Sequence, residues 1–307
     1  MHAAPFSAVQ AFMQQHPELS AVSPQWQSLA GGSSNQLYRS EATVRGTPAA
    51  VVLRVNAAPE QVPGVDRARE AEVLAQLQGQ HWAPWVLHCA LSADEQTDDK
   101  EGHGWLLTHW HGDSLTDPLT AAQRAQLRTA VAAWQALELD PKTVPANSLR
   151  MDYTALLAGY AAQLVGLPME RALQQMVERA SRELARLPGV PAVLTHHDLH
   201  PGNLCAHQDT LVVLDWEYAA LGNAWFDAAA LVQRCGMKAE DIAVLPAFVG
   251  LEDTALAEGL MRARWLGDAL ECLWYWARGL GGTDRKMADL MRETLRLLKQ
   301  PEETAAD

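Results

Sequence analysis

The chain has 307 residues, of which 48% are hydrophobic and 20% are charged, and its formal net charge is −13. This length allows a large core in one large domain or two lobes, and the composition excludes a coiled coil and a mainly disordered chain. The acidic balance argues against a nucleic-acid partner, because phosphates demand a basic patch. We find neither a membrane-spanning apolar run nor a signal-peptide pattern, and the four cysteines contain no C-x-x-C pair. We therefore expect a cytoplasmic protein with reduced thiols and no membrane partner.

The N-terminal region predicts a short helix over residues 6–16 and strands over 26–30 and 36–40. A turn of small residues joins the two strands, and its backbone amides can approach phosphate oxygens closely because glycine has no side chain in the way. An ordinary hairpin loop is the more common meaning of such a run, and the ending of a Walker loop is missing. The candidate phosphate-binding residues of this turn are Gly32, Ser33, Ser34 and Asn35.

The next strand, residues 49–55, carries one cation, Arg54, within an alternating apolar run. We expect Arg54 to reach nucleotide phosphates and to pair with an acid on the helix predicted over residues 66–77. Helical periodicity places Glu70 on the same side as the apolar residues of that helix, whereas Glu72 points away. A solvated helix with surface ion pairs is the alternative interpretation.

Two strands joined by an acidic loop are predicted between residues 85 and 107. The following segment changes from strand to polar turn, and we expect an adenine ring to bind the backbone between Thr108 and Trp110. The predicted lobe boundary lies at Gly112, which gives an N-terminal nucleotide-binding lobe over residues 1–112 and a helical lobe over residues 113–307.

The second half of the chain is predicted to be mainly helical, with Thr120 as a helix N-cap. The expected helices span residues 120–139, 153–165, 169–187 and 255–280. Aromatic residues at helical spacing on the last helix are typical of a core. Trp274 is nevertheless a candidate acceptor-binding residue, since aromatic rings attract cations.

The stretch from Leu194 to Glu217 contains the chemistry. Asp198 and Asn203 stand in an H-x-D-x-x-x-x-N pattern, and Asp215 follows a short apolar strand. Phosphoryl transfer from ATP needs a carboxylate beside the attacking hydroxyl, and an amide oxygen and a second carboxylate for Mg²⁺. The three side chains fit these roles in that order.

Two other interpretations of this stretch stay open. Asp, Asn, Gly and Pro also form ordinary surface turns. Three histidines crowd together here and suggest a site for zinc, copper or iron, although Asp and Asn oxygens suit Mg²⁺ better; these histidines are His196, His197 and His200. We expect His196 and the downstream Asp227 to give structural support, with Asp227 capping a helix or bracing the loop of Asp198.

The strings His196-His-Asp-Leu-His-Pro-Gly-Asn203 and Leu214-Asp-Trp-Glu-Tyr-Ala219 are highly specific. With the glycine turn, Arg54 and Glu70 upstream, the chain resembles the aminoglycoside phosphotransferase and choline kinase superfamily along nearly its whole length. The resemblance implies an α+β, bilobal protein-kinase-like fold, with an N-terminal antiparallel sheet lobe and a larger helical C-terminal lobe.

The resemblance also implies ATP and Mg²⁺ as cofactors. It makes Asp198 the catalytic base or orienting carboxylate, and Asn203 and Asp215 the metal ligands. Arg54 becomes the phosphate-binding cation, with Glu70 as its partner.

Two departures from the aminoglycoside enzymes concern the acceptor. Those enzymes usually carry Lys where Arg54 stands, and Asp-Trp-Glu-Tyr-Ala is similar to bacterial choline and thiamine kinases. Both favour a kinase of a small cationic alcohol such as thiamine, choline or ethanolamine, with Glu217 as a substrate or secondary metal group. His197 stands where Gly is common.

The alternatives are an aminoglycoside or sugar phosphotransferase and, in another class, a nucleotide-binding pseudokinase or scaffold. A protein kinase is disfavoured because neither Asp-Phe-Gly nor Ala-Pro-Glu bounds an activation loop. The sequence leaves the oligomeric state undetermined.

Overall fold

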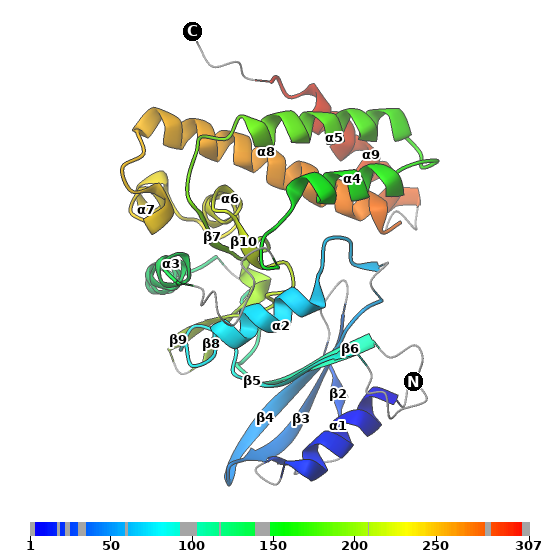
Figure 1. Cartoon of the computed structure of the whole chain (residues 1–307), viewed down its shortest axis with the longest axis vertical. Helices are drawn as coiled ribbons and strands as arrows, with labels where there is room; N and C mark the ends of the chain where they lie inside the picture. Colours follow the sequence, from blue (N-terminus) through cyan, green and yellow to red (C-terminus); the bar gives the residue numbers. More distant parts are fainter. Residues whose placement is uncertain are drawn as a thin grey trace. The chain divides into compact units, whose positions relative to one another are not determined.

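The computed structural model describes residues 4–16, 19–21, 25–29, 35–58, 61–92, 103–116, 118–138, 148–207, 209–279 and 284–302. The chain forms two compact units (Figure 1). The first unit comprises residues 1–116 and 202–217, and the second comprises residues 117–201 and 218–307. The segment 202–217 thus groups with the first 116 residues, although it lies far from them in the sequence. The predicted lobe boundary at Gly112 stays a prediction.

The first unit is built on an antiparallel sheet in the order β1-β3-β4-β6-β5, with β2 also paired to β3. These strands are β1 (Leu19–Ala21), β2 (Gln27–Ser28), β3 (Gln36–Val44), β4 (Thr47–Val55), β5 (Val86–Ser92) and β6 (His103–His109). Buried apolar residues such as Val51 and Leu53 alternate along β4, and they share one core with Val9 of helix α1 (Ala4–Gln15). Helix α1 therefore packs against the sheet that carries Arg54.

Helix α2 (Arg67–Gln76) begins where Asp66 accepts hydrogen bonds from the N–H groups of Ala68 and Arg69, as an N-cap residue does. Its buried side includes Val73 and, among the apolar residues, the carboxylate of Glu70. An acidic residue on the buried side of a helix needs a partner.

A hairpin of β8 (Leu204–His207) and β9 (Thr210–Val213) completes the first unit. The backbone N–H of Val213 donates to Trp82, and the N–H of Leu115 donates to Leu204. These two bonds tie the hairpin to the preceding part of the unit.

The second unit is mainly helical, with one two-stranded antiparallel ladder of β7 (Ala192–Thr195) and β10 (Ala220–Asn223). Its helices are α3 (Ala121–Gln135), α4 (Tyr153–Gln163), α5 (Glu170–Ala185), α6 (Trp225–Gln233), α7 (Ala239–Ala243), α8 (Asp253–Ala277) and α9 (Asp284–Lys299), with a short 3₁₀ turn at Pro246–Phe248. A further 3₁₀ turn, Pro201–Asn203, includes the first residues of the segment 202–217. Thr120 caps α3 in a reciprocal capping box with Gln123, which confirms the predicted N-cap.

Helices α4, α5, α8 and α9 share one apolar core, into which α8 inserts Trp265 and Trp276. Within the described part of the chain, no helix has both the length and the apolar content needed to cross a membrane. The α+β architecture, with an antiparallel sheet in the N-terminal part and helices in the C-terminal part, confirms the predicted fold class.

Candidate functional site

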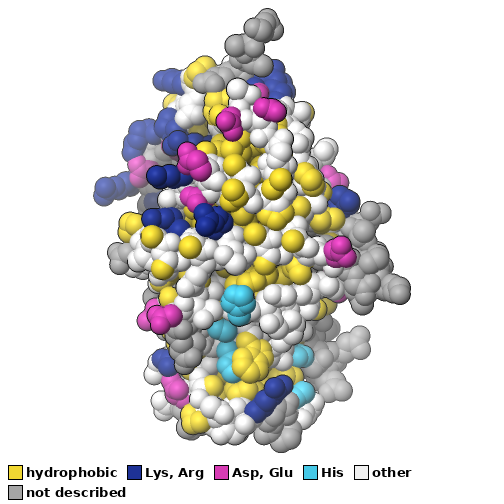
Figure 2. Space-filling view, turned by 90° about the vertical axis from the view of Figure 1, so that its left-hand side faces the viewer, with side chains coloured by type: hydrophobic (Ala, Val, Ile, Leu, Met, Phe, Trp, Pro, Cys, Tyr) yellow, Lys and Arg dark blue, Asp and Glu magenta, His cyan; other side chains and the backbone are white. Residues whose placement is uncertain are grey.

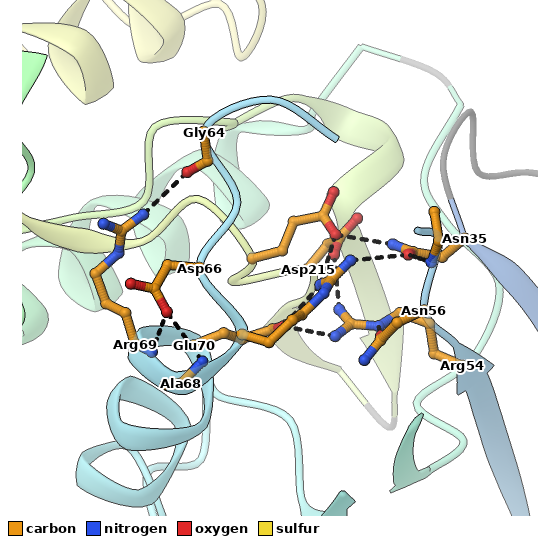
Figure 3. A network of polar contacts seen from close by, with 12 residues as sticks. Asn35, Arg54, Asn56, Gly64, Asp66, Ala68, Arg69, Glu70 and Asp215 are labelled. Carbon is orange, nitrogen blue, oxygen red and sulfur yellow. Dashed lines mark hydrogen bonds and ion pairs between the residues drawn. The ribbon is translucent and has the colours of Figure 1, made fainter. Parts of the chain in front are cut away.

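Arg54 is the centre of a buried polar network in the first unit (Figure 3). Its Nη2 donates to Glu70 Oε2 at 2.6 Å, its Nη1 donates to Asp215 Oδ1 at 3.1 Å, and its Nε donates to Asn56 Oδ1 at 3.1 Å. The guanidinium thus joins β4, α2 and the segment after β9. These contacts confirm the expected pairing of Arg54 with Glu70, while the role in phosphate binding stays a prediction.

Burial and ionic attraction shift the pKa values of Arg54 and Glu70 in opposite directions. Burial raises the pKa of Glu70, but Arg54 and Arg67 lower it by more, so the carboxyl titrates below its ordinary value. Burial lowers the pKa of Arg54, and the opposing attraction of Glu70, Asp215 and Glu217 leaves it above its ordinary value. Both groups are therefore charged at neutral pH.

A second arginine, Arg67, extends the network. Its Nη1 donates to Glu70 Oε2 at 2.8 Å and to Glu217 Oε2 at 2.9 Å, and its Nη2 donates to Asn35 Oδ1 at 3.0 Å. Asn35 in turn donates to Glu217 Oε2 at 2.8 Å. Glu217, the candidate acceptor or secondary metal group, is buried and engaged with these two side chains in this structure.

Asn203 and Asp215 flank the two strands of the β8–β9 hairpin, and Leu214 N–H donates to the carbonyl of Asn203 at 2.8 Å. Because Leu204 pairs with Val213 in the antiparallel ladder, the residues just outside that pair lie at one end of the hairpin. The side chain of Asp215 is 33% exposed, and its backbone has a positive φ of 61°.

The donor chemistry of this pair fits Mg²⁺, which prefers carboxylate and amide oxygens and usually keeps substrate phosphates and water in its remaining positions. Among the residues that the structure describes, no three His, Cys, Asp or Glu side chains gather as a metal site. The histidines of the Asp198 loop thus give no support to the alternative of a zinc, copper or iron site.

Asp198 lies in the second unit, on the loop that follows β7. Asp227, in the first turn of α6, holds this loop by accepting the backbone N–H groups of His196 and His197, each at 2.9 Å. The N–H of Asp198 donates to His196 Nδ1 at 3.2 Å, and His200 Nε2 lies 3.7 Å from Asp198 Oδ2. Asp227 and His196 therefore brace the loop, and Asp198 itself stays 37% exposed.

His197 adopts the left-handed conformation, with φ of 67°. Glycine adopts this conformation most easily. Here the ring is held by Tyr153, whose hydroxyl lies 2.7 Å from His197 Nε2 and accepts the N–H of Asn223 at 2.8 Å. A Cβ on Gly222 would lie 2.7 Å from the His197 ring and 2.7 Å from the Tyr153 hydroxyl, so that glycine is required for this contact.

Burial raises the pKa of Asp227 to about 6, although the two backbone N–H donors lower it. The negative charge of Asp198 acts in the same direction as burial. The brace of the Asp198 loop is consequently a group that titrates in mildly acidic solution.

The expected adenine-binding segment, Thr108 to Trp110, lies at the end of β6. The N–H of Trp110 donates to Ala50 at 2.8 Å, and Arg39 lies over its ring at 5.2 Å from the centroid. Nearby, Trp85 stacks on His109 at 4.1 Å. Figure 2 shows histidine side chains beside hydrophobic ones on one face of the molecule.

Gly32, Ser33 and Ser34 of the predicted glycine turn lie outside the described residues. Their neighbour Asn35 is described, and it accepts the N–H of Ala57 at 3.0 Å in addition to its bonds with Arg67 and Glu217. The phosphate-binding role of the turn stays a prediction.

Trp274, the candidate acceptor-binding residue of α8, is half-buried and has polar partners. Its Nε1 donates to the hydroxyl of Tyr218 at 2.8 Å, and the guanidinium of Arg278 lies 4.5 Å from its ring centroid. Tyr275 packs edge-on at 5.1 Å. The Trp274 ring thus already contacts a cation of the chain itself.

The sequence prediction did not include Arg67, Asn56 and Tyr153. Arg67 stands three residues before Glu70, a spacing that brings side chains together on a helix. That spacing was a usable signal for the contact with Glu70, but the contact with Glu217 joins residues 150 positions apart.

A model of the phosphotransferase enzyme family (APH) matches residues 25–266 of the chain. The comparison with curated proteins found no match to this chain. The match covers the glycine turn, the Arg54 network, the Asp198 loop and most of α8.

Solved structures of kinases and phosphotransferases share the fold. A choline/ethanolamine kinase family protein from Mesorhizobium loti superposes with a TM-score of 0.66 at 17% identity, over 97% of this chain and 95% of that one. Choline kinase LicA from Streptococcus pneumoniae gives a TM-score of 0.63 at 16% identity, over 96% and 99% of the two chains. The ADP-bound aminoglycoside phosphotransferase APH(2'')-Ib gives 0.60 at 13% identity, over 95% and 96%.

At these identities the structural likeness shows the fold, and the family model shows the class of enzyme. Because that model spans more than half of the chain, the protein belongs to the phosphotransferase enzyme family and is a nucleotide-binding, small-molecule phosphotransferase.

Proposed function

We propose that this protein transfers the γ-phosphoryl group of ATP, with Mg²⁺, to a hydroxyl group of a small cationic alcohol of the thiamine, choline or ethanolamine type. The observation that carries the proposal is the buried guanidinium of Arg54, which contacts Glu70 and Asp215 together. A cation fixed in this way supports the binding of nucleotide phosphates, which a protein of net charge −13 otherwise repels.

On the donor side, Arg54 binds and orients phosphate oxygens, and the backbone of the glycine turn that ends at Asn35 covers them. Asn203 and Asp215 would hold Mg²⁺. When bound, Mg²⁺ offsets the negative charge that develops on the transferring phosphoryl group.

On the acceptor side, Asp198 orients the attacking hydroxyl and accepts its proton as the bond to phosphorus forms. Asp227 fixes the backbone on which this carboxylate stands, so that little orientational freedom is lost in the reaction. Partial exposure of Asp198 leaves it accessible to an acceptor.

The Trp274 ring supports a cationic acceptor, because it already attracts the Arg278 guanidinium. The choline and ethanolamine kinases among the similar structures are named for acceptors of this kind. The alternative acceptor is an aminoglycoside or a sugar, and it is favoured by the similarity to APH(2'')-Ib. A scaffold that binds nucleotide without transfer is the alternative of another class.

An acceptor panel tests the proposal. ATP consumption is measured with Mg²⁺ and, in turn, with choline, ethanolamine, thiamine, aminoglycosides and neutral sugars. We expect consumption that depends on one cationic alcohol. Consumption with neutral sugars alone contradicts the acceptor class, and nucleotide binding with no consumption across the panel favours the scaffold.

A further inference from the structure

One side chain connects the separate parts of the donor side. Arg67 contacts Glu70, which pairs with Arg54, and also Glu217 and Asn35. The side chain of Arg67 is 17% exposed, while the side chains of Glu70 and Glu217 are 1% and 5% exposed. Two buried carboxylates and one buried amide oxygen therefore share one cation.

These contacts depend on the shape of the arginine side chain, which lysine does not share. A planar guanidinium presents several N–H groups in fixed directions, so that it can hold acceptors from different segments at once. Asn35 closes the arrangement, because its Nδ2 donates to the same Oε2 of Glu217 that accepts from Arg67.

The segment that follows β9 is held by several contacts. Asp215 has φ of 61°, a conformation that residues other than glycine seldom adopt. Before it, the N–H of Leu214 donates to Asn203. After it, Trp216 Nε1 donates to Val213 and Glu217 is held by Arg67, so the turn is fixed on both sides of Asp215.

We infer that Arg67 is a positioning residue that, through Glu217, fixes Asp215 in the orientation that binds the metal of the nucleotide complex. The inference rests on the proposed function. According to this inference, Glu217 supports the metal ligand Asp215 and does not bind the acceptor.

The test compares Arg67→Gln with a matched control elsewhere. Arg262 of α8, like Arg67, bridges two carboxylates, which are Glu183 and Glu258, but it is more deeply buried and lies in the second unit. Arg262→Gln therefore also removes a guanidinium that bridges two carboxylates, and it leaves the Arg67 network unchanged. Glu217→Gln, the double variant Arg67→Gln/Glu217→Gln, and Arg67→Lys complete the set.

The first readout is the affinity for Mn²⁺ in the presence of a saturating, nonhydrolysable ATP analogue, measured by electron paramagnetic resonance. Loss of a residue that supports a metal ligand typically weakens metal binding by about 10- to 100-fold. We expect a loss in this range for Arg67→Gln, an intermediate loss for Arg67→Lys, and a change below about twofold for Arg262→Gln. The double variant is expected to bind no more weakly than Glu217→Gln alone, because the two residues act as one unit.

The second readout needs no ligand. The protein is labelled with 5-fluorotryptophan, and the resonance of Trp216, which stands between Asp215 and Glu217, is assigned with Trp216→Phe. We expect Arg67→Gln to shift or broaden this ¹⁹F resonance, and Arg262→Gln to leave it in place.

If Arg67→Gln folds, binds Mn²⁺ as tightly as the unsubstituted chain and keeps the Trp216 resonance, the inference is wrong. The proposed function is not affected by that result. Equal losses of metal affinity in Arg67→Gln and Arg262→Gln also overturn the inference, because they indicate general destabilisation. If Arg67→Gln fails to fold, a Glu217→Gln protein with unchanged metal affinity and Trp216 resonance overturns it. If the unsubstituted chain binds no Mn²⁺ with the nucleotide analogue, the proposed function fails and the inference fails with it.

Discussion

The carboxylate of Asp227 shows how a buried residue determines the position of an exposed one. It accepts the N–H groups of the two residues before Asp198, and Asp198 points from the loop that these bonds hold. The sequence offered capping or bracing for Asp227, and the hydrogen bonds to His196 and His197 are a brace. The left-handed backbone at His197 was not among the predictions, although a position where Gly is common was a usable signal for it. The contacts of the His197 ring with Tyr153 and Gly222 come from distant segments and were not predictable.

Titration of Asp227 gives a prediction about stability. Burial raises its pKa from 3.8 to about 6, so the native protein binds a proton in this window that the unfolded chain does not. Its contribution to the free energy of unfolding is therefore fully present below about pH 4 and is lost as the pH rises through about 6. Relative to Asp227→Asn, the unsubstituted protein should lose about 2 kcal/mol between pH 4 and pH 7. Urea unfolding at several pH values measures this difference, and a difference independent of pH contradicts the prediction.

At the scale of elements, β4 and α2 are joined by a pair whose charges are almost entirely withdrawn from water. Arg54 and Glu70 are 7% and 1% exposed. Helical periodicity was sufficient to select Glu70 over Glu72, because the apolar residues of α2 define its buried side. The additional contact of Arg54 with Asp215 was not predicted, since it depends on where the β8–β9 hairpin lies within the first unit.

Substitutions of Arg54 and Glu70 can distinguish the contribution of this pair to protein stability from its contribution to nucleotide binding. Arg54→Met leaves Glu70 with one cation fewer and should destabilise the protein by about 3–5 kcal/mol. Arg54→Met combined with Glu70→Leu should regain most of this stability, because well-packed apolar groups replace a buried ion pair at little cost.

The double variant should nevertheless bind nucleotide as weakly as Arg54→Met. Chemical unfolding and calorimetric titration with an ATP analogue measure the two quantities. Recovery of nucleotide affinity together with stability would show that Arg54 contributes only to the fold.

Helix α8 carries the candidate acceptor residue, and its aromatic spacing in the sequence was typical of a core. Most of that interpretation holds, since Trp265 and Trp276 are buried in the core of the second unit. Trp274 differs from them because it is half-buried, bonded to Tyr218 and covered by Arg278. Helical periodicity does not reveal such partners, because Tyr218 belongs to another segment and Arg278 lies beyond the last turn of the helix.

If a cationic acceptor binds the Trp274 ring, Arg278 competes with it. Trp274→Ala should raise KM for the acceptor by about 3- to 30-fold with little change in kcat, as expected for the loss of a cation–π contact. Arg278→Ala should lower KM for a cationic acceptor and leave KM for ATP unchanged. Steady-state kinetics with the acceptor identified by the panel measures both, and unchanged acceptor KM values in both variants exclude Trp274 from acceptor binding.

For the whole molecule, the order of short motifs along the chain was sufficient to predict the fold class. Each motif is a short run of neighbouring residues, so it can be recognised in the sequence without knowledge of the rest of the fold. The grouping of residues 202–217 with the first 116 residues was not predicted, because it depends on long-range contacts such as Val213 with Trp82. Helix α9 was likewise not predicted as a separate element, although it packs in the core of the second unit.

The central claim is that Asp198 directs a phosphoryl group from ATP to a small-molecule hydroxyl. The most direct measurement is ³¹P NMR of the reaction with ATP, Mg²⁺ and the active acceptor, for the unsubstituted protein, Asp198→Ala and the control Asp209→Asn in the β8–β9 turn. We expect equal formation of ADP and a phosphomonoester by the first and third proteins. For Asp198→Ala we expect transfer slower by about 10²- to 10⁴-fold, with nucleotide still bound. Full turnover by Asp198→Ala, or ADP formed with inorganic phosphate and no phosphomonoester, contradicts the claim.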